Sequence, residues 1–247
     1  MIHLIVFLYG LLLGSFYNVV GLRVPTGKSI VKPRSACSLC GHQLTARDLV
    51  PVLSYIALKG RCRKCGAKIS MMYPVTELLT ALLFLYSYLL YGFSAPFWTA
   101  ILLFSMLMIL VVADFAYMLI PDKIILFFLP LFIIMRFTQP LDPWWDALLG
   151  AAVGFGLLLL IAVVSNGGMG GGDIKLFGVL GFVLGTKLVL LTFLLACFFG
   201  AVIGLALMAA GIVKRGKPMP FGPYIALAAV VAYTHGNDMI RWYLQFF

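Results

Sequence analysis

Long runs of apolar residues, separated by short polar breaks, predict helices that cross a membrane. Most of these runs approach the roughly 20 residues that a helix needs to span the hydrocarbon core of a bilayer. Eight such runs lie at residues 1–22, 74–91, 95–113, 120–137, 144–164, 174–185, 188–213 and 221–233. We therefore expect an all-α polytopic membrane protein with about eight transmembrane helices.

The first apolar run, 1–22, lacks both the basic start and the small-residue cleavage site of a secretory signal, so we expect it to stay as a membrane helix. The run at 174–185 is short for a full span. It crosses the membrane only if Gly185, Thr186 and Lys187 form a tight turn near the outer face. The alternative is a tightly packed helix that is only partly inserted.

Residues 23–72 break the apolar pattern and form the only sizeable soluble segment that the sequence predicts. This segment holds ten Lys or Arg residues, the single acid Asp48 and four of the five cysteines. We predict three parts: a first transmembrane helix at 1–22, a cytosolic tetracysteine zinc-binding loop at 23–72, and a transmembrane core at 73–247.

Composition supports the membrane assignment and removes other classes. Hydrophobic residues make up 63% of the chain and charged residues only 11%, whereas about a quarter of a soluble domain is charged. Collagen-like, disordered and disulfide-scaffold chains are excluded by the same figures. The net charge of +10 is no sign of nucleic-acid binding here, because basic residues in so apolar a chain mark cytosolic loops.

The basic residues predict the orientation, since Lys and Arg of short loops are retained on the cytosolic side. With the N-terminus outside and eight spans, fifteen of the eighteen basic residues fall on the inner side. The inner ones beyond 23–72 are Lys123, Lys175, Lys214, Arg215 and Lys217, and the outer ones are Arg136, Lys187 and Arg241. We expect both chain ends to face outward.

The same orientation brings three aspartates, Asp114, Asp122 and Asp173, to the inner face. Acids at the ends of membrane helices are costly unless they are paired, solvated or functional. The charge count did not use acids, so their agreement independently indicates a shared site. From residue type alone, Asp114 and Asp173 fit a catalytic or a structural role equally well. Asp122 follows Pro121 and is interpreted as a helix cap.

Other polar positions and the glycines have structural interpretations. Glu77, near the start of the second span, is placed to neutralise basic loop residues, and Asp142 and Asp146 are typical of the outer interface. The glycine-rich run at 167–172 allows Asp173 to approach a neighbouring helix closely. Three Gly-x-x-x-Gly pairs predict close helix contacts; they are Gly10 with Gly14, Gly150 with Gly154, and Gly200 with Gly204.

Two C-x-x-C pairs, separated by 21 residues, predict one zinc site. The four expected ligands are Cys37, Cys40, Cys62 and Cys65. Four protein ligands leave no open position for water, so the metal is expected to fold the loop rather than to catalyse. A reducing cytosolic side argues against two disulfides. His42 is an alternative ligand that the site does not need, and Cys197 fits a packing residue in an apolar run.

Six groups of residues occur in order along the chain. They are 14–19 with Arg23 and Pro25; the cysteine pairs with 51–54, Gly60 and Arg61; Tyr73, Pro74 and Glu77; Asp114 with 120–122; 168–173 with Lys175 and Leu176; and 220–224. In this combination the chain resembles the type IV prepilin peptidases of bacteria over almost its whole length.

This resemblance implies an aspartic endopeptidase of the bacterial inner membrane, with its active site at the cytosolic face. Such enzymes cut the leader from type IV prepilins or pseudopilins after a glycine, and their catalytic acids match Asp114 and Asp173. Many members also methylate the new N-terminus with S-adenosylmethionine, but no residue of the sequence identifies the donor site. The chain departs from the family's pattern at two positions, where Met72 stands in place of an Arg and Ser38 in place of a Pro. These departures bear on methyl transfer rather than on proteolysis.

Two other functional classes remain open from the residues alone. A secondary transporter uses boundary acids as ion sites, but it has no need of a tetracysteine loop. A membrane scaffold with a zinc-knuckle interaction loop would give Asp114 and Asp173 no function. The partners expected for the peptidase are prepilins or pseudopilins and membrane lipid, without nucleic acid, and the sequence does not indicate an oligomeric state.

Overall fold

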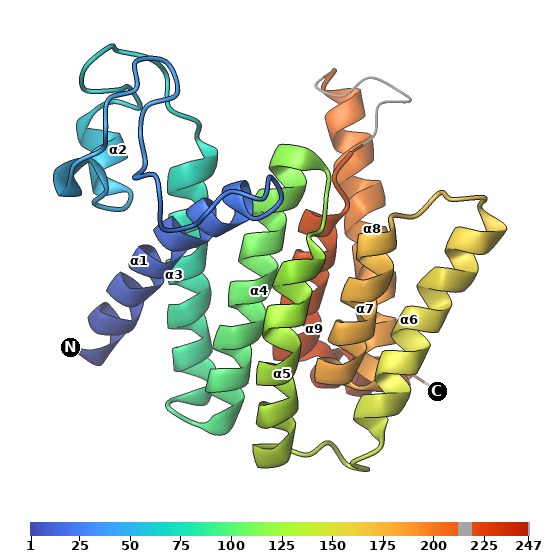
Figure 1. Ribbon diagram of the computed structural model, residues 1–247. Helices are drawn as coiled ribbons and strands as arrows, with labels where there is room; N and C mark the ends of the chain where they lie inside the picture. The colour runs from blue at the N-terminus through green and yellow to red at the C-terminus, as the bar shows by residue number, and fades with distance from the viewer. Residues whose placement is uncertain (212–218, 247) are drawn as a thin grey trace. The chain divides into compact units, whose positions relative to one another are not determined.

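The computed structural model describes residues 1–211 and 219–246, and its regular elements are helical (Figure 1). Within these residues the elements are α1 (Ile2–Arg23), η1 (Ala46–Asp48), α2 (Leu53–Ala57), α3 (Met72–Tyr91), α4 (Ala95–Tyr117), α5 (Asp122–Thr138), α6 (Asp146–Val164), α7 (Gly171–Leu184), α8 (Thr186–Ala209) and α9 (Gly222–Leu244). The prediction of an all-α fold is confirmed. Lys214, Arg215 and Lys217 of the charge count lie outside the described residues.

Each of the eight apolar runs corresponds to one helix, namely α1 and α3 to α9. Among the described residues, α1, α3, α4, α6 and α8 are long and apolar enough to cross a membrane, so the chain is an integral membrane protein. Helices α5 and α7 are shorter, with 17 and 14 residues. The chain does turn tightly after α7, but the turn is Gly185 alone, at φ +80°, because Thr186 and Lys187 already belong to α8.

The chain divides into two compact units, Met1–Ala113 and Asp114–Phe247, and the boundary lies within α4. In the first unit, α1 packs against α3 at very short range, because Gly10 and Gly14 face the backbone of α3. A Cβ atom at Gly14 would lie 2.7 Å from the Cα atom of Glu77. The segment between α1 and α3, residues 24–71, is called the cysteine loop and includes α2. Figure 1 shows it at one end of this helix pair. The predicted contact of the first glycine pair is therefore confirmed.

In the second unit, α6 packs against α7, α5 against α7, and α8 against α9. Gly150 and Gly154 of α6 lie directly against the backbone of α7, as the second Gly-x-x-x-Gly pair predicted. Gly200 and Gly204 meet only side chains, at ordinary or slightly short contact distances. The third pair therefore makes close contacts with side chains at the start of α9 and just before it, and not with a neighbouring backbone.

Candidate functional site

The four paired cysteines converge on one point in the first unit. Their sulfur atoms all lie within 4.8 Å of one another, with Cys37 Sγ 3.8 Å from Cys65 Sγ and Cys40 Sγ 4.0 Å from Cys62 Sγ. A tetrahedral zinc ion with Zn–S bonds of about 2.3 Å requires sulfurs about 3.8 Å apart. The residues present therefore fit a four-thiolate metal site, and His42 is not needed for it.

The two C-x-x-C segments have the same backbone geometry, which explains why their sulfurs point to a common centre. In the first, the N–H of Gly41 donates to the carbonyl of Cys37; in the second, the N–H of Gly66 donates to that of Cys62. Both glycines have φ near +70°, a conformation that residues with a Cβ atom rarely adopt. The glycine after each pair is thus required by the turn.

Backbone N–H groups also point at the first sulfur of each pair. Those of Cys40 and Leu39 lower the pKa of the Cys37 thiol to about 6. The corresponding N–H groups of Cys65 and Lys64 lower the pKa of Cys62. Because the thiolate is the form that binds metal, these hydrogen bonds prepare both turns for a cation.

A polar cross-link ties the second cysteine pair to the segment that follows the first pair. Arg63 Nε donates to Asp48 Oδ1 at 2.8 Å, and Thr45 donates to Asp48 Oδ2 from its backbone N–H and its hydroxyl. The Thr45 hydroxyl and the Arg63 guanidinium lower the pKa of Asp48 to about 2. The single acid of the loop therefore stays ionised and links its two halves.

Cys197 lies far along the chain from this cluster, on α8. Its side chain is exposed at the surface of the helix. Among the described residues Cys197 is exposed, so its interpretation as a packing residue is not supported, and it lies outside the cysteine cluster as expected.

Asp114 lies in the last turn of α4 and is 6% exposed. Its Oδ2 accepts a hydrogen bond of 2.7 Å from the backbone N–H of Gly222, the first residue of α9. The N–H groups of the first helical turn have no partner within their own helix. The Asp114 carboxylate thus satisfies one of them and lies at the positive end of the α9 dipole.

This contact requires a glycine at position 222. A Cβ atom there would lie 2.7 Å from Asp114 Oδ2 and 3.2 Å from Asp114 Cβ. Any larger residue would push the carboxylate away from the N–H that holds it. Gly222 is therefore a positioning residue for Asp114, a role that its place in the sequence did not reveal.

Asp173 lies in the first turn of α7, and its carboxylate accepts a hydrogen bond from the backbone N–H of Gly170, the N-cap of that helix. This is the reach-back half of a capping box. The structural interpretation of Asp173 as a helix-start residue is thus correct. The Asp173 carboxylate is also close enough to Asp114 for the two charges to interact. The structure therefore brings together the two acids that the sequence singled out.

The glycine-rich run lets the residue before Asp173 approach the connection between α4 and α5 closely. A Cβ atom at Gly172 would lie 2.7 Å from Cβ of Ile120, in the connection between α4 and α5, whereas one at Gly171 would meet nothing within 4 Å. Only some of the glycines in this run are therefore required by close packing.

Asp122 does not cap α5, so that interpretation is wrong. The N-cap is Pro121, and no side chain caps this helix. Asp122 Oδ2 instead accepts from Lys175 Nζ at 2.6 Å, in an exposed ion pair between the starts of α5 and α7. Lys175, the second residue after Asp173, thus links the start of α7 to the start of α5.

Two further acids differ from expectation. Asp146 accepts hydrogen bonds from the backbone N–H and the hydroxyl of Thr186, so it caps α8 rather than only marking an interface. Glu77 is 7% exposed, and it accepts from the N–H of Val52 and the hydroxyl of Ser15. Both of these donors to the Glu77 carboxylate are neutral, and no basic loop residue among those described binds it.

Two known families match the chain. The bacterial peptidase A24 N-terminal domain matches residues 8–91, which include the four paired cysteines. The type IV leader peptidase family matches residues 101–205, which include Asp114 and Asp173.

Curated relatives match nearly the full length. A prepilin leader peptidase/N-methyltransferase of Bacillus subtilis is 44% identical, over 98% of this chain and 97% of that protein. Proteins of the same name from Aeromonas salmonicida and Pseudomonas aeruginosa are each 35% identical, over 98% and 97% of this chain and 93% and 92% of their own lengths. No solved structure matches the chain.

Proposed function

The chain belongs to the type IV leader peptidase family, and we propose that it is a membrane-embedded aspartic endopeptidase that removes the leader from type IV prepilins or pseudopilins after a glycine. The observation that carries the proposal is the placement of Asp114 and Asp173 in one unit with interacting carboxylates. We propose these two residues as the catalytic acids. Neither the transporter nor the scaffold gains support from the contacts or from the relatives.

Two neighbouring carboxylates do not both ionise readily, so the pair tends to hold one shared proton. The ionised member accepts a proton from a water molecule whose oxygen attacks the carbonyl carbon of the scissile bond, while the protonated member donates to the carbonyl oxygen. The C–N bond then breaks: the departing nitrogen takes the proton that the first carboxylate accepted from water, and a hydroxyl of the intermediate returns a proton to the second carboxylate. The N–H of Gly222 keeps Asp114 in place throughout.

We propose that the protein lies in the bacterial inner membrane with residues 23–72 and the two aspartates on the cytosolic side. The excess of Lys and Arg in 23–72 supports this orientation. We expect the leader to be cut while its pilin is still in the membrane, when the leader is on the cytosolic side. The proposed active site and the leader then lie on the same side of the membrane.

We propose zinc as the metal of the four-cysteine site and, in keeping with the name of the relatives, an additional N-methyltransferase activity that uses S-adenosylmethionine. Zinc at four thiolates supplies folding free energy to a loop that has few buried apolar residues. The tetrahedral spacing of the four sulfurs supports this choice. Residues 23–72 form the zinc-binding part and 73–247 the peptidase core in this proposal.

The first prediction concerns the two acids. Asp114→Asn and Asp173→Asn should each reduce leader removal by about 1,000-fold or more, because an amide cannot share the proton that the reaction needs. The double variant should lose little more than either single one, as expected of groups that act together. Single-turnover cleavage of a prepilin in detergent measures this.

Asp122→Asn is the control for the loss of a nearby negative charge. Its ion pair with Lys175 is exposed, so its removal should change cleavage less than about tenfold. Substantial cleavage by either Asp114→Asn or Asp173→Asn, with contaminating protease excluded, would contradict the two-carboxylate mechanism.

The second prediction concerns Gly222. Gly222→Ala should lower kcat by about 10- to 100-fold with little change in KM, because the added methyl group displaces Asp114 Oδ2 from its charge-assisted hydrogen bond. Gly156→Ala, in α6, adds the same methyl group where nothing lies within 4 Å and should keep normal kinetics. Equal kcat values for the two variants would show that Gly222 does not position Asp114.

The third prediction concerns the metal. Elemental analysis of the purified protein should give about one zinc per chain, because four thiolates complete a single tetrahedral site. Cys37→Ser should lose that zinc, whereas Cys197→Ser, outside the cluster, should retain it. An active protein with four reduced cysteines and no bound metal would refute the zinc site.

The fourth prediction concerns orientation. In a cysteine-free chain, whose spanning helices still set its topology, a single cysteine at Gln245 should react with an impermeant maleimide in intact cells. A cysteine at Thr45 should react only after the membrane is permeabilised. The reverse labelling pattern would invert the proposed orientation and place 23–72 outside.

A further inference from the structure

The short helix α2 has an apolar side that faces away from the rest of the first unit. Leu53 and Ile56 are three residues apart, so they lie on one face of the helix, and they are 65% and 64% exposed. Ala57, beside them on that face, is exposed as well. A helix face that meets water normally carries polar residues. The exposed side of α2 is therefore suited to an apolar neighbour.

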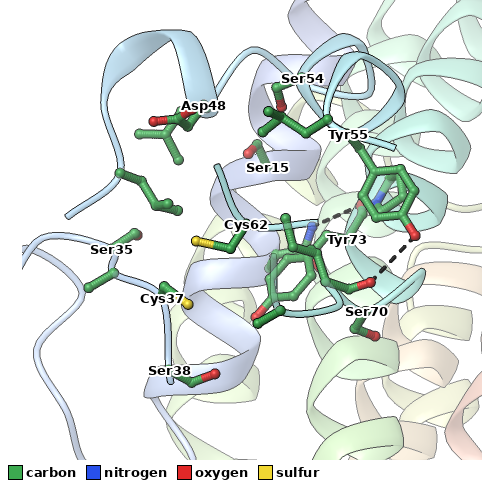
Figure 2. Close-up of a pocket in the computed structure, with 18 of the residues that line it drawn as sticks. Ser15, Ser35, Cys37, Ser38, Asp48, Ser54, Tyr55, Cys62, Ser70 and Tyr73 are labelled. Carbon is green, nitrogen blue, oxygen red and sulfur yellow. Dashed lines mark hydrogen bonds between the residues drawn. The ribbon is translucent and has the colours of Figure 1, made fainter. Parts of the chain in front are cut away.

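The opposite side of α2 faces the interior of the first unit. Ser54, Tyr55 and Leu58 line a cavity of about 490 Å³, whose other walls come from α1, α3 and the rest of the cysteine loop. Figure 2 labels Ser54 and Tyr55 among the side chains around this cavity. The Tyr55 hydroxyl lies 3.4 Å from the carbonyl oxygen of Ile69 and 2.9 Å from Met71 Sδ. The two polar side chains of α2 thus point inward, which is the reverse of a water-facing helix.

A hydrogen bond to α3 fixes the level of α2 relative to the membrane. The backbone N–H of Val52, the N-cap of α2, donates to Glu77 Oε2 at 2.8 Å, and Figure 1 shows α2 beside the start of α3. Glu77 is the fourth residue of the predicted span 74–91, about 4.5 Å along the helix from its first residue. Val75 and Leu78, in the same turns, are exposed apolar residues, as on a helix surrounded by lipid. The start of α2 therefore lies near the boundary between headgroups and acyl chains, where interfacial helices bind.

Two exposed basic residues, Lys59 and Arg61, follow directly after this helix. Residues 23–72 hold ten Lys or Arg residues and the single acid Asp48, which pairs with Arg63. Among the described residues, neither Lys59 nor Arg61 forms an ion pair. Basic clusters beside a spanning helix bind anionic lipid headgroups. Charge complementarity therefore favours an anionic membrane surface over a second copy of this chain, whose cysteine loop would carry the same positive charge.

We propose that α2 is an interfacial anchor. Leu53 and Ile56 insert among the acyl chains of the adjacent leaflet, and Lys59 and Arg61 bind the phosphates of anionic phospholipids such as phosphatidylglycerol. Insertion removes two large apolar side chains from water, and the two cations donate charge-assisted hydrogen bonds to phosphate oxygens. The anchor holds the cysteine loop against the membrane surface, and it does not depend on either activity proposed above.

The test is photo-crosslinking of the full-length protein in nanodiscs that contain equal amounts of phosphatidylglycerol and phosphatidylcholine. The photoreactive residue p-benzoylphenylalanine is placed at Ile56 and, in a second protein, at Leu53, and mass spectrometry identifies what each probe captures. Both probes should capture phospholipid. Both native side chains are exposed, so the replacements disturb no packing, and the second position keeps the test decisive if one protein fails to accumulate.

Ser54 is the matched control on the opposite side of the same helix. The cavity next to it has room for the probe, so a probe at Ser54 should capture the protein itself and about tenfold less lipid than the probe at Ile56. Equal lipid capture at Ser54 and Ile56 would overturn the proposal, because α2 would then have no particular lipid-facing side. Capture of a second copy, of another segment of the same chain, or of nothing by the Ile56 probe would also overturn it.

The identity of the captured lipid tests the two basic residues. At Ile56, phosphatidylglycerol should exceed phosphatidylcholine by about threefold or more, because Lys and Arg near the surface attract anionic headgroups. Leu126 is an exposed residue of α5 within the predicted span 120–137, and a probe there should capture the two lipids in near-equal amounts. Lys59→Gln and Arg61→Gln together should bring the ratio at Ile56 close to the ratio at Leu126.

Two results would overturn the assignment of Lys59 and Arg61 to lipid phosphates. In the first, the lipid ratio at Ile56 already equals the ratio at Leu126 before either basic residue is replaced. In the second, the excess of phosphatidylglycerol at Ile56 survives the double substitution.

Discussion

The N–H groups at the starts of helices have no partner within their own helix, and binding them constrains where the acids of this fold lie. Aspartates bind them at three helices: Asp146 for α8, Asp173 for α7 and Asp114 for α9. A structural role therefore does not exclude a chemical one for Asp114 or Asp173. The hydrogen bonds that these two carboxylates accept at the starts of α9 and α7 also hold the carboxylates near each other.

The cysteine loop is held by a different constraint, because it has almost no core of its own. Within residues 23–72 the buried positions are Pro51, Gly60 and Cys62. Two similar cysteine turns, which fit a metal ion, and the ion pair of Asp48 take the place of a core. Glu77 anchors the loop to α3 through the N–H of Val52, a residue held at φ +60°.

The sequence predicted the features that depend on local pattern. Apolar runs located the helices, C-x-x-C spacing identified the four cysteines that cluster, and charge counting placed Asp114 and Asp173 on one face. It did not predict partners that are distant in the chain. Gly222 lies 108 residues from Asp114, and nothing local to either residue indicates their hydrogen bond. Asp122 was misread because a carboxylate beside a helix start serves equally as a cap or as the partner of a distant lysine, here Lys175.

The two proposed reactions, hydrolysis and methyl transfer, must occur in a fixed order. The nitrogen of a peptide bond shares its lone pair with the carbonyl group, so it is a poor nucleophile towards a methyl donor. In the proposed sequence, only hydrolysis of this bond, for which Asp114 and Asp173 are the proposed acids, releases an amine that can be methylated. The coupling between the two proposed reactions therefore lies in the substrate, and it requires no residue common to both.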